Sequence, residues 1–523
     1  MFADKLFING KFYTMRNKGH IVEALVVKNG NIIFTGTTEE ALKYQSDEII
    51  DLKNSVVLPG FIDSHMHLAA AVENIDTVDL GGVKSLNEVV ELLKNKSLEI
   101  PDNEWIVASS LDEAKFNNSR LLNRYDLKVH KIKNPILIRR LSGHSFTVND
   151  KALELAGIDR SFASDHKDIF DIDEKGFPTG IINTQGMKYF SHLLNKSLEK
   201  KIKKTYDLLK LASSYGLTTL HTFSLKSMSL LDYFDVYYEI NRKYKLPIRI
   251  IISFDELPRQ GIKTGFGNTF LKYGCYKIFC DGALSTYSAF LSRPYADKDK
   301  CYGYANHTAK ELNKLVSKAC EMDLDVAFHA IGDRAIKMAL DAIEGVKKRC
   351  KYNSKRFRLI HGMVLNKSLI SKIRNLNIIL DVQPSFLFNA FNYAQKRLGS
   401  ERLNYFMPFR SLIDQNILLT GGSDFPVSSL NPFMGIYAAV TRESINNSGQ
   451  LLNENQRISV YEAISLYTKN ASYCCGEESM KGTLEPGKVA DFIILDKDPF
   501  RIPSGELKDI RVIETYVNGE KVY

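Results

Sequence analysis

Two histidines separated by a single residue, His65 and His67, end the segment VLPGFIDSHMH (57–67). Side chains at positions i and i+2 of a strand lie on the same face, so these two imidazoles can hold one metal ion. Each histidine taken alone is also compatible with an ordinary hydrogen-bonded core or loop residue. The His-x-His spacing therefore raises a metal site as a hypothesis that other residues must support.

Further candidate ligands lie at the ends of later apolar runs. His329 ends one run, the next run contains His361, and Asp424 follows another in Gly422-Ser423-Asp424. In a (β/α)8 barrel the carboxyl ends of all strands meet at one face, where such enzymes place their active sites. These residues converge with the first two histidines only in a closed barrel, so the fold and the site support each other.

Lys277 lies in the apolar segment Tyr276-Lys277-Ile278-Phe279, where an unpaired ammonium group would be costly. A buried ion pair is one solution. The other is a carbamate on the lysine nitrogen, which would turn the cation into a carboxylate able to bridge two metal ions. The residues alone leave both readings open.

The segments that must position these residues predict an α/β protein. Eight near-continuous apolar runs are typical of parallel strands buried on both faces, and helix-length amphipathic segments such as Ala309–Met322 and Ala335–Lys348 separate the later ones. No glycine-rich nucleotide-binding motif follows any run, which disfavours an open doubly wound sheet. We therefore expect a TIM-like (β/α)8 barrel built from Val56–Ile62, Leu217–Phe223, Pro247–Phe254, Cys275–Phe279, Asp325–His329, Phe357–Leu365, Ile378–Gln383 and Ile417–Gly421.

The two ends of the chain differ from its middle. Both contain short apolar segments separated by turns, including Asn9-Gly10 and Asn518-Gly519, which are typical of β-hairpins. We expect a composite β-sandwich from residues 1–57 and 480–523, with the barrel at 58–479. Residues 69–200 are too many for a simple crossover between two strands, so we expect an inserted cap subdomain there.

Composition excludes several other classes of protein. The chain has 523 residues, 44% of them hydrophobic and 25% charged, which excludes disordered and fibrous proteins. The net charge of +9 is spread along the chain, so nucleic acid is not an expected partner. No apolar stretch is long enough for a membrane helix, and seven cysteines without a regular framework favour a reducing cytoplasm. A homodimer is the default expectation for assembly.

Seven motifs in barrel order resemble the metal-dependent amidohydrolase superfamily, and within it the branch that contains N-substituted formamide deformylases (amidohydrolase family 3). The resemblance covers almost the whole chain, and it implies a distorted (β/α)8 barrel with a composite β-sandwich. The motifs are VLPGFIDSHMH (57–67), LIRRLSGHSFTVNDKAL (137–153), KIFCDGALSTYSAFL (277–291), FHAIGDRAI (328–336), DVQPSF (381–386), GGSDFPV (421–427) and GTLEPGKVADFIILDKDP (482–499).

The resemblance also implies a ligand set and a mechanism. His65 and His67 would bind a first metal ion together with Asp424, His329 and His361 would bind a second, and Lys277 would bridge the two as its carbamate. Zinc is the expected metal, with one or two ions per chain. Hydroxide activated by the metal would attack a non-peptide C–N bond in a small amide, formamide or cyclic amide, with Asp424 as the general base.

Four further residues are candidates for substrate binding: His144, Arg140, Tyr287 and Gln383. His144 is equally compatible with a salt bridge or hydrogen bond within the cap. The family often has Asp-Gly-His where this chain has Ser142-Gly143-His144, and an arginine at the position of Tyr287. These departures mean that substrate specificity cannot be copied from any relative.

Two other functions are compatible with the motifs. The same activated hydroxide could deaminate an amidine-like substrate, although deaminases of this superfamily often use one metal ion and no bridging lysine. The chain could also be a metal-binding scaffold without catalysis, but the complete ligand set argues against it. Release of ammonia would indicate deamination, and absence of any turnover would indicate the scaffold.

Overall fold

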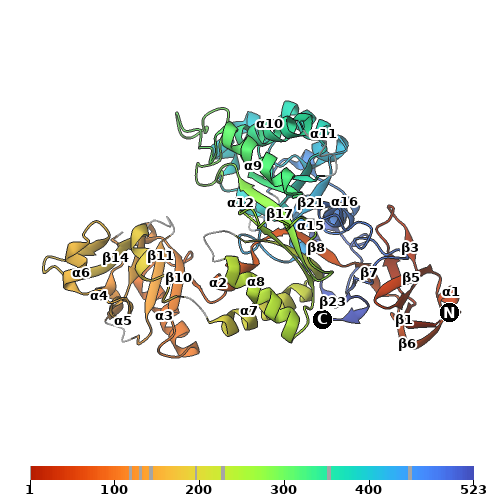
Figure 1. Cartoon of the computed structure of the whole chain (residues 1–523), viewed down its shortest axis with the longest axis horizontal. Coiled ribbons are helices and arrows are strands. Elements are labelled where there is room, and N and C mark those ends of the chain that lie inside the picture. The colour runs from red at the N-terminus through yellow and green to blue at the C-terminus, as the bar shows by residue number, and fades with distance from the viewer. Residues whose placement is uncertain are drawn as a thin grey trace. The chain divides into compact units, whose positions relative to one another are not determined.

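The computed structural model describes residues 2–116, 120–128, 132–140, 145–194, 197–224, 230–349, 355–445 and 450–523. The chain forms two compact units, one of Met1–Ala71 with Ile202–Tyr523 and one of Val72–Lys201. The first unit contains a barrel and a β domain that includes both termini (Figure 1). No helix within the described residues is long and apolar enough to span a bilayer.

Eight parallel strands form the sheet of the barrel, in the order of the sequence, which confirms the predicted fold class. The barrel is nearly closed, and the loop after β21 contacts the other edge strand where the backbone N–H of Asp424 donates to the His65 carbonyl at 2.7 Å. The strands are β8 (Phe61–Met66), β15 (Leu217–Ser224), β16 (Arg249–Phe254), β17 (Leu271–Phe279), β18 (Val326–Ala330), β19 (Phe357–His361), β20 (Ile379–Val382) and β21 (Leu419–Gly421).

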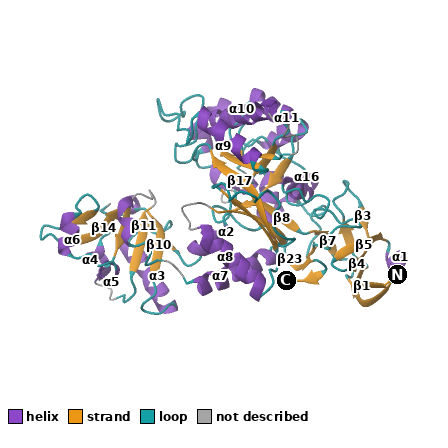
Figure 2. Ribbon diagram, in the orientation of Figure 1, coloured by secondary structure: helices purple, strands orange, loops and turns teal. Residues whose placement is uncertain are grey.

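The barrel strands are almost completely buried, as expected for parallel strands covered on both faces. Helices flank them in Figure 2, and α9 begins with a capping box between Thr308 and Glu311. The helices of the first unit include most of α7 (Leu198–Ser214), and α8 (Leu230–Lys243), α9 (Ala309–Glu321), α10 (Asp333–Arg349), α11 (Lys367–Asn375), α12 (Leu387–Ala390), α13 (Ala394–Leu403), α14 (Phe409–Asp414), α15 (Pro432–Thr441), α16 (Val460–Leu466) and α17 (Lys469–Cys474).

The first predicted strand, Val56–Ile62, is in fact two strands. β7 (Val56–Pro59) belongs to the terminal β domain, and β8 begins the barrel at Phe61. Gly60 lies between them, and a Cβ there would overlap the side chain of Thr218. The apolar run is continuous because both strands are buried, so hydrophobicity alone gives no sign of the division.

The terminal β domain contains two sheets, and the second sheet pairs strands from both ends of the chain. Its core includes the ring of Phe7, whose centroid lies 4.9 Å from that of Phe492 and 5.2 Å from that of Tyr516. The strands are β1 (Phe2–Ile8), β4 (Ala24–Lys28), β5 (Asn31–Gly36) and β6 (Gln45–Asp51) in one sheet, and β2 (Lys11–Tyr13), β3 (Ile21–Val22), β7, β22 (Phe492–Leu495), β23 (Val512–Val517) and β24 (Glu520–Lys521) in the other.

The unit of Val72–Lys201 has a mixed six-stranded sheet with its own apolar core. The predicted bounds of 69–200 and the proposed role of this segment as a cap stay predictions. Its strands are β9 (Val78–Asp79), β10 (Ile106–Leu111), β11 (Ile136–Arg140), β12 (Ser145–Val148), β13 (Phe170–Ile172) and β14 (Pro178–Asn183), and its main helices are α3 (Leu86–Glu99), α4 (Arg124–Lys128), α5 (Asp150–Leu155) and α6 (Arg160–Asp165).

Candidate metal centre

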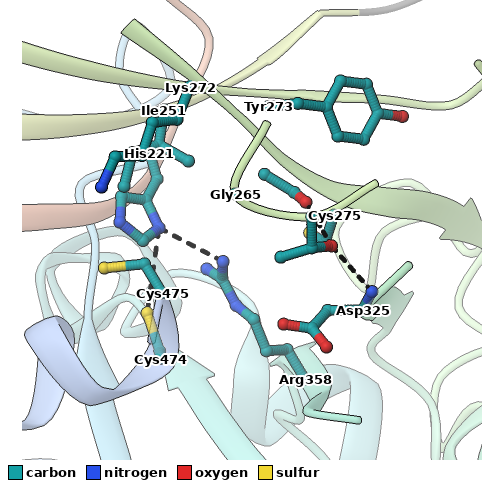
Figure 3. Close-up of a pocket in the computed structure, with 12 residues that line it drawn as sticks. His221, Ile251, Gly265, Lys272, Tyr273, Cys275, Asp325, Arg358, Cys474 and Cys475 are labelled. Carbon is teal, nitrogen blue, oxygen red and sulfur yellow. Dashed lines mark hydrogen bonds between the residues drawn. The ribbon is translucent and has the colours of Figure 1, made fainter. Parts of the chain in front are cut away.

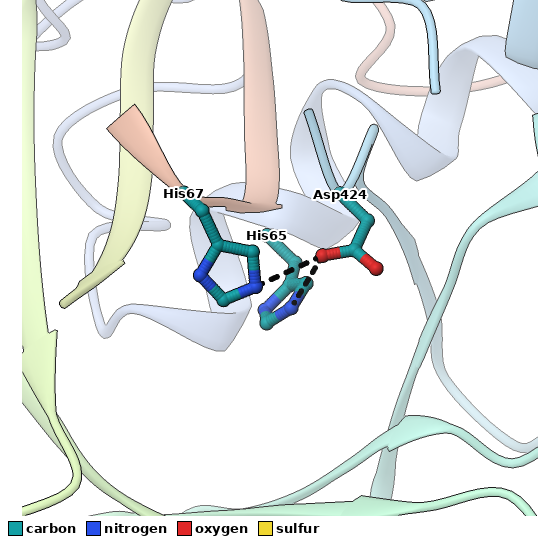
Figure 4. Close-up of side chains that lie close together, drawn as sticks. All are labelled: His65, His67 and Asp424. Atoms are coloured by element: carbon teal, nitrogen blue, oxygen red, sulfur yellow. Dashed lines mark ion pairs between the residues drawn. The ribbon is translucent and has the colours of Figure 1, made fainter. Parts of the chain in front are cut away.

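His65, His67 and Asp424 meet at the carboxyl end of the barrel, where β8 ends next to the loop that follows β21 (Figure 4). Asp424 Oδ1 lies 3.2 Å from His65 Nε2 and 3.1 Å from His67 Nε2. The backbone N–H of His67 donates to the carbonyl of Phe425 at 2.8 Å, which joins the end of β8 to the loop after β21. Three donor atoms from two distant parts of the sequence therefore face one point.

Polar atoms at this point lack ordinary partners. Asp424 Oδ1 and both ring nitrogens of His65 are buried and accept or donate no hydrogen bond among the described residues. Buried polar groups are nearly always hydrogen-bonded, so such a convergence of atoms without hydrogen bonds fits a cation. Burial, followed by the charges of Lys277 and His67, holds the pKa of His65 well below its ordinary value. The imidazole is thus neutral, as a metal ligand must be.

The other candidate ligands lie around His361. The ring centroid of His361 is 4.6 Å from that of His329 and 5.7 Å from that of His65. Burial is the main cause that lowers the pKa of His329 to about 3 and that of His361 well below its ordinary value. Both rings are therefore neutral at physiological pH and able to bind a metal ion.

Lys277 is buried in β17 with its ammonium nitrogen close to two aromatic faces. Nζ lies 4.7 Å from the ring centroid of Phe223 and 5.0 Å from that of Phe279. It makes no hydrogen bond within the described part of the chain. Burial lowers the pKa of Lys277 to about 8, against a smaller opposing effect of Asp424. The amine is therefore partly neutral near physiological pH, and the structure supplies no direct ion pair for its charged form among the described residues.

Three of the histidines have one ring nitrogen fixed by an oxygen that can only accept. His67 Nδ1 donates to the carbonyl of Phe223 at 2.9 Å, and His329 Nε2 donates to that of Gly282 at 3.2 Å. His361 Nδ1 donates to Gln383 Oε1 at 2.6 Å. A neutral imidazole that donates through one nitrogen keeps the other as a lone-pair donor. The nitrogens left for a metal are therefore Nε2 of His67, Nδ1 of His329 and Nε2 of His361.

Two of the candidate ligands have unusual backbone geometry. His361 and Asp424 have φ values of +71° and +56°, in the left-handed region that residues other than glycine rarely adopt. Such conformations persist only where the surrounding structure enforces them, and they cluster at functional sites. Here they turn each side chain at the end of its strand, where the other ligands meet.

Two buried aspartates next to the ligands were not predicted from the sequence. Asp63 Oδ1 accepts the backbone N–H groups of His65 and Ser423, both at 3.0 Å. Asp281 lies just after β17, and its Oδ1 is 3.7 Å from His329 Nε2. Burial is the main cause that raises the pKa of each carboxyl group to about 7. An aspartate next to a strand is common in turns and caps, so the only available signal was proximity in sequence to the ligands.

A buried polar cluster inside the barrel contacts the residue before His65. Arg358 donates to the carbonyl of Ser64 at 2.6 Å and pairs with Asp381, which in turn accepts from the Ser64 hydroxyl at 2.7 Å. On its other side Arg358 donates to His221 Nδ1, which also faces the thiol of Cys474 at 3.8 Å (Figure 3). His221 is thus held inside this buried cluster, and Ser64 is fixed next to His65.

The candidate substrate residues have different surroundings. Arg140 is buried in the unit of Val72–Lys201, where it donates to Glu113, Ser145, Thr147 and the carbonyl of Leu122. The Tyr287 hydroxyl donates to Asp297 at 3.1 Å, and the guanidinium carbon of Arg397 lies 3.8 Å from the centroid of its ring. Gln383 contacts His361 as described above, and His144 lies outside the described residues. The substrate roles of these four residues stay predictions.

A parallel barrel with a convergent His and Asp set at its carboxyl face defines the class of metal-dependent hydrolases. The chain belongs to the amidohydrolase family, whose profile matches residues 48–523. This membership confirms the family predicted from the motifs.

Individual relatives span nearly the whole chain. YtcJ of Bacillus subtilis, which its name assigns provisionally to the amidohydrolases, is 32% identical over 98% of each chain. The N-substituted formamide deformylase of Arthrobacter pascens is 27% identical over 99% of this chain and 97% of its own. The crystal structure of an uncharacterized metal-dependent hydrolase from Pyrococcus horikoshii OT3 is 28% identical and covers 96% of this chain and 99% of its own, with a TM-score of 0.80.

Proposed function

We propose that this amidohydrolase cleaves a non-peptide C–N bond in a small amide, formamide or cyclic amide, with Asp424 as the general base. The observation that carries the proposal is the position of Asp424 Oδ1, about 3 Å from two imidazole nitrogens and without a hydrogen bond. Similarity to a formamide deformylase over nearly the whole chain supports the choice of bond.

We assign His65, His67 and Asp424 to a first metal ion and His329 and His361 to a second. The nitrogen and oxygen donors suit zinc, and the unpaired buried atoms fit a cation. Divalent ions in such sites lower the pKa of a bound water and polarise a carbonyl oxygen. The carbonyl and amide acceptors on His67, His329 and His361 orient the free nitrogen of each ring before any metal arrives.

Lys277 is the proposed bridge between the two ions. Its neutral amine can add carbon dioxide, forming a nitrogen–carbon bond and releasing one proton, which gives a carbamate with two oxygens. The lowered pKa of Lys277 and the absence of a direct ion pair for Nζ among described residues support this modification over a charged amine. A bridging lysine in turn favours amide cleavage over single-metal deamination.

In the proposed reaction Asp424 accepts the proton of the attacking water and passes it to the departing amine. The rings of Phe223, Phe279 and Phe386 lie against His65, His329 and His361 respectively, and give the site apolar walls. Arg140, His144, Tyr287 and Gln383 remain proposed substrate contacts.

The proposal is tested by screening zinc-loaded protein against N-formyl amines, acylated amino compounds and cyclic ureas, with amine and ammonia measured separately. Amine release that is lost in Asp424→Asn supports the proposal. Release of ammonia from an amidine would instead favour the deaminase. Absence of turnover on every substrate, by metal-loaded protein, would favour the scaffold.

A further inference from the structure

The carboxylate of Asp281 binds backbone N–H groups from two different loops. Its side chain is fully buried, and it accepts from Phe290 at 2.9 Å, Ile331 at 3.0 Å and Gly332 at 2.9 Å. Phe290 lies in the long loop after β17, whereas Ile331 and Gly332 directly follow β18. The carboxylate thus joins the carboxyl ends of the fourth and fifth barrel strands.

These two strands carry proposed ligands of the second metal ion. Lys277 lies in β17, four residues before Asp281, and His329 lies in β18, two residues before Ile331. The carbonyl that fixes His329 Nε2 belongs to Gly282, the residue after Asp281. Any movement of the Asp281 segment therefore changes both the spacing of Lys277 and His329 and the orientation of the His329 ring.

The packing around this connection leaves little freedom. A Cβ at Gly332 would overlap the carbonyl oxygen of Phe290, so the two loops approach at backbone distance. The same oxygen accepts the N–H of Arg334 at 3.1 Å, at the start of α10. The two loops and the start of the helix are held together around one carboxylate.

We propose that Asp281 is a positioning residue that sets the second half of the metal site by tying β17 to β18. This inference rests on the proposed function, because it takes Lys277 and His329 as ligands. It assigns to Asp281 no contact with substrate and no proton transfer.

Asp63 offers a matched control at the other half of the site. It is also a buried aspartate that joins two ligand-bearing segments, but both of its backbone donors, His65 and Ser423, bind the same oxygen, Oδ1. An asparagine can keep that oxygen in place, and the Ser423 hydroxyl, which also bonds this carboxyl group, can rotate to suit the amide. At Asp281 the three donors are divided between Oδ1 and Oδ2, so an asparagine must turn an NH₂ group toward at least one N–H.

The test compares wild-type, Asp281→Asn and Asp63→Asn proteins for zinc bound per chain across a range of buffered free zinc, with the melting temperature of each. We expect Asp281→Asn to bind the second ion 10- to 100-fold more weakly and the first ion normally, with activity restored by added zinc. Asp63→Asn should bind as the wild type does. Unchanged binding in Asp281→Asn, or equal weakening of both ions, would overturn the inference.

Hydrogen exchange on the wild-type protein gives a test that does not depend on folding of a variant. If the Asp281 carboxylate holds the loop after β18, the backbone amides of Ile331 and Gly332 stay protected from exchange after zinc is removed by a chelator. Loss of their protection in the metal-free protein would contradict the role of Asp281. His329→Ala separates this inference from the proposed function: if that variant keeps two ions, the ligand assignment itself is wrong.

Discussion

At the scale of single residues, the sequence predicted donor types but not what orients them. The His-x-His spacing and the strand-end positions of His329, His361 and Asp424 were enough to nominate the ligands. The groups that fix the rings are mostly backbone carbonyls, such as those of Phe223 and Gly282, and a carbonyl is present at every residue. Its contribution depends on tertiary structure, so no sequence pattern could identify it.

Asp424 is the residue on which the proposed chemistry depends most. Asp424→Asn keeps the size of the side chain and one oxygen, but the amide cannot accept a proton from water. We expect kcat to fall by about 10²- to 10⁴-fold while most of the bound metal remains. Steady-state kinetics and elemental analysis on the same preparation measure both quantities. Near-normal turnover with intact metal content would remove Asp424 from the mechanism.

Gln383 can be assigned to metal binding or to substrate binding by one pair of variants. Gln383→Leu leaves the Nδ1–H of His361 unpaired in a buried site, so we expect zinc affinity to fall about 10- to 100-fold. Gln383→Glu keeps an acceptor oxygen and serves as the control. Zinc titration measures the effect. Unchanged zinc affinity with a raised KM in Gln383→Leu would instead support the substrate contact predicted from the sequence.

The pH dependence of carbamate formation follows from the pKa of Lys277, which burial lowers to about 8. Only the neutral amine adds carbon dioxide, and the neutral fraction grows as pH rises through the pKa. Metal-free protein incubated with ¹³C-bicarbonate should therefore show much more carbamate by NMR near pH 8.5 than near pH 6.5. The Lys277→Ala variant supplies the background. Equal labelling of wild type and variant at both pH values would exclude the carbamate.

At the scale of elements, the apolar runs predicted the barrel strands well because parallel strands are buried on both faces. Each run overlaps a strand, including Pro247–Phe254 with β16 and Cys275–Phe279 with β17. The prediction of one strand over Val56–Ile62 was wrong, because the chain passes from one sheet to another while it stays buried throughout. What divides it is the close approach of Gly60 to Thr218, which lies more than 150 residues away in the chain.

The pairing of the two chain ends predicts a defect when one end is removed. Deleting residues 1–50 removes Phe7, whose ring packs against Phe492 and Tyr516, and exposes their apolar faces. We expect the truncated protein to aggregate, as measured by size-exclusion chromatography. Phe7→Ala is a milder control and should lose about 3–5 kcal/mol of stability while staying monodisperse. A soluble and fully active truncation would show that this domain is dispensable.

At the scale of the whole molecule, the candidate site depends on the near closure of the barrel. Its two edge strands, β8 and β21, bring His65 next to Asp424 across more than 350 residues of sequence. Arg358 donates to the backbone carbonyl of Ser64 and Asp381 accepts from its hydroxyl, so the end of β8 that carries the candidate ligands is supported from inside the barrel. We therefore expect metal binding at this site to require a folded barrel.

In the proposed function this architecture holds catalytic metal, and elemental analysis of freshly purified, active protein tests that role most directly. We expect between one and two divalent ions per chain in the wild type. His65→Ala and His67→Ala should each lose one ion. Fully active protein that contains no metal would contradict the account.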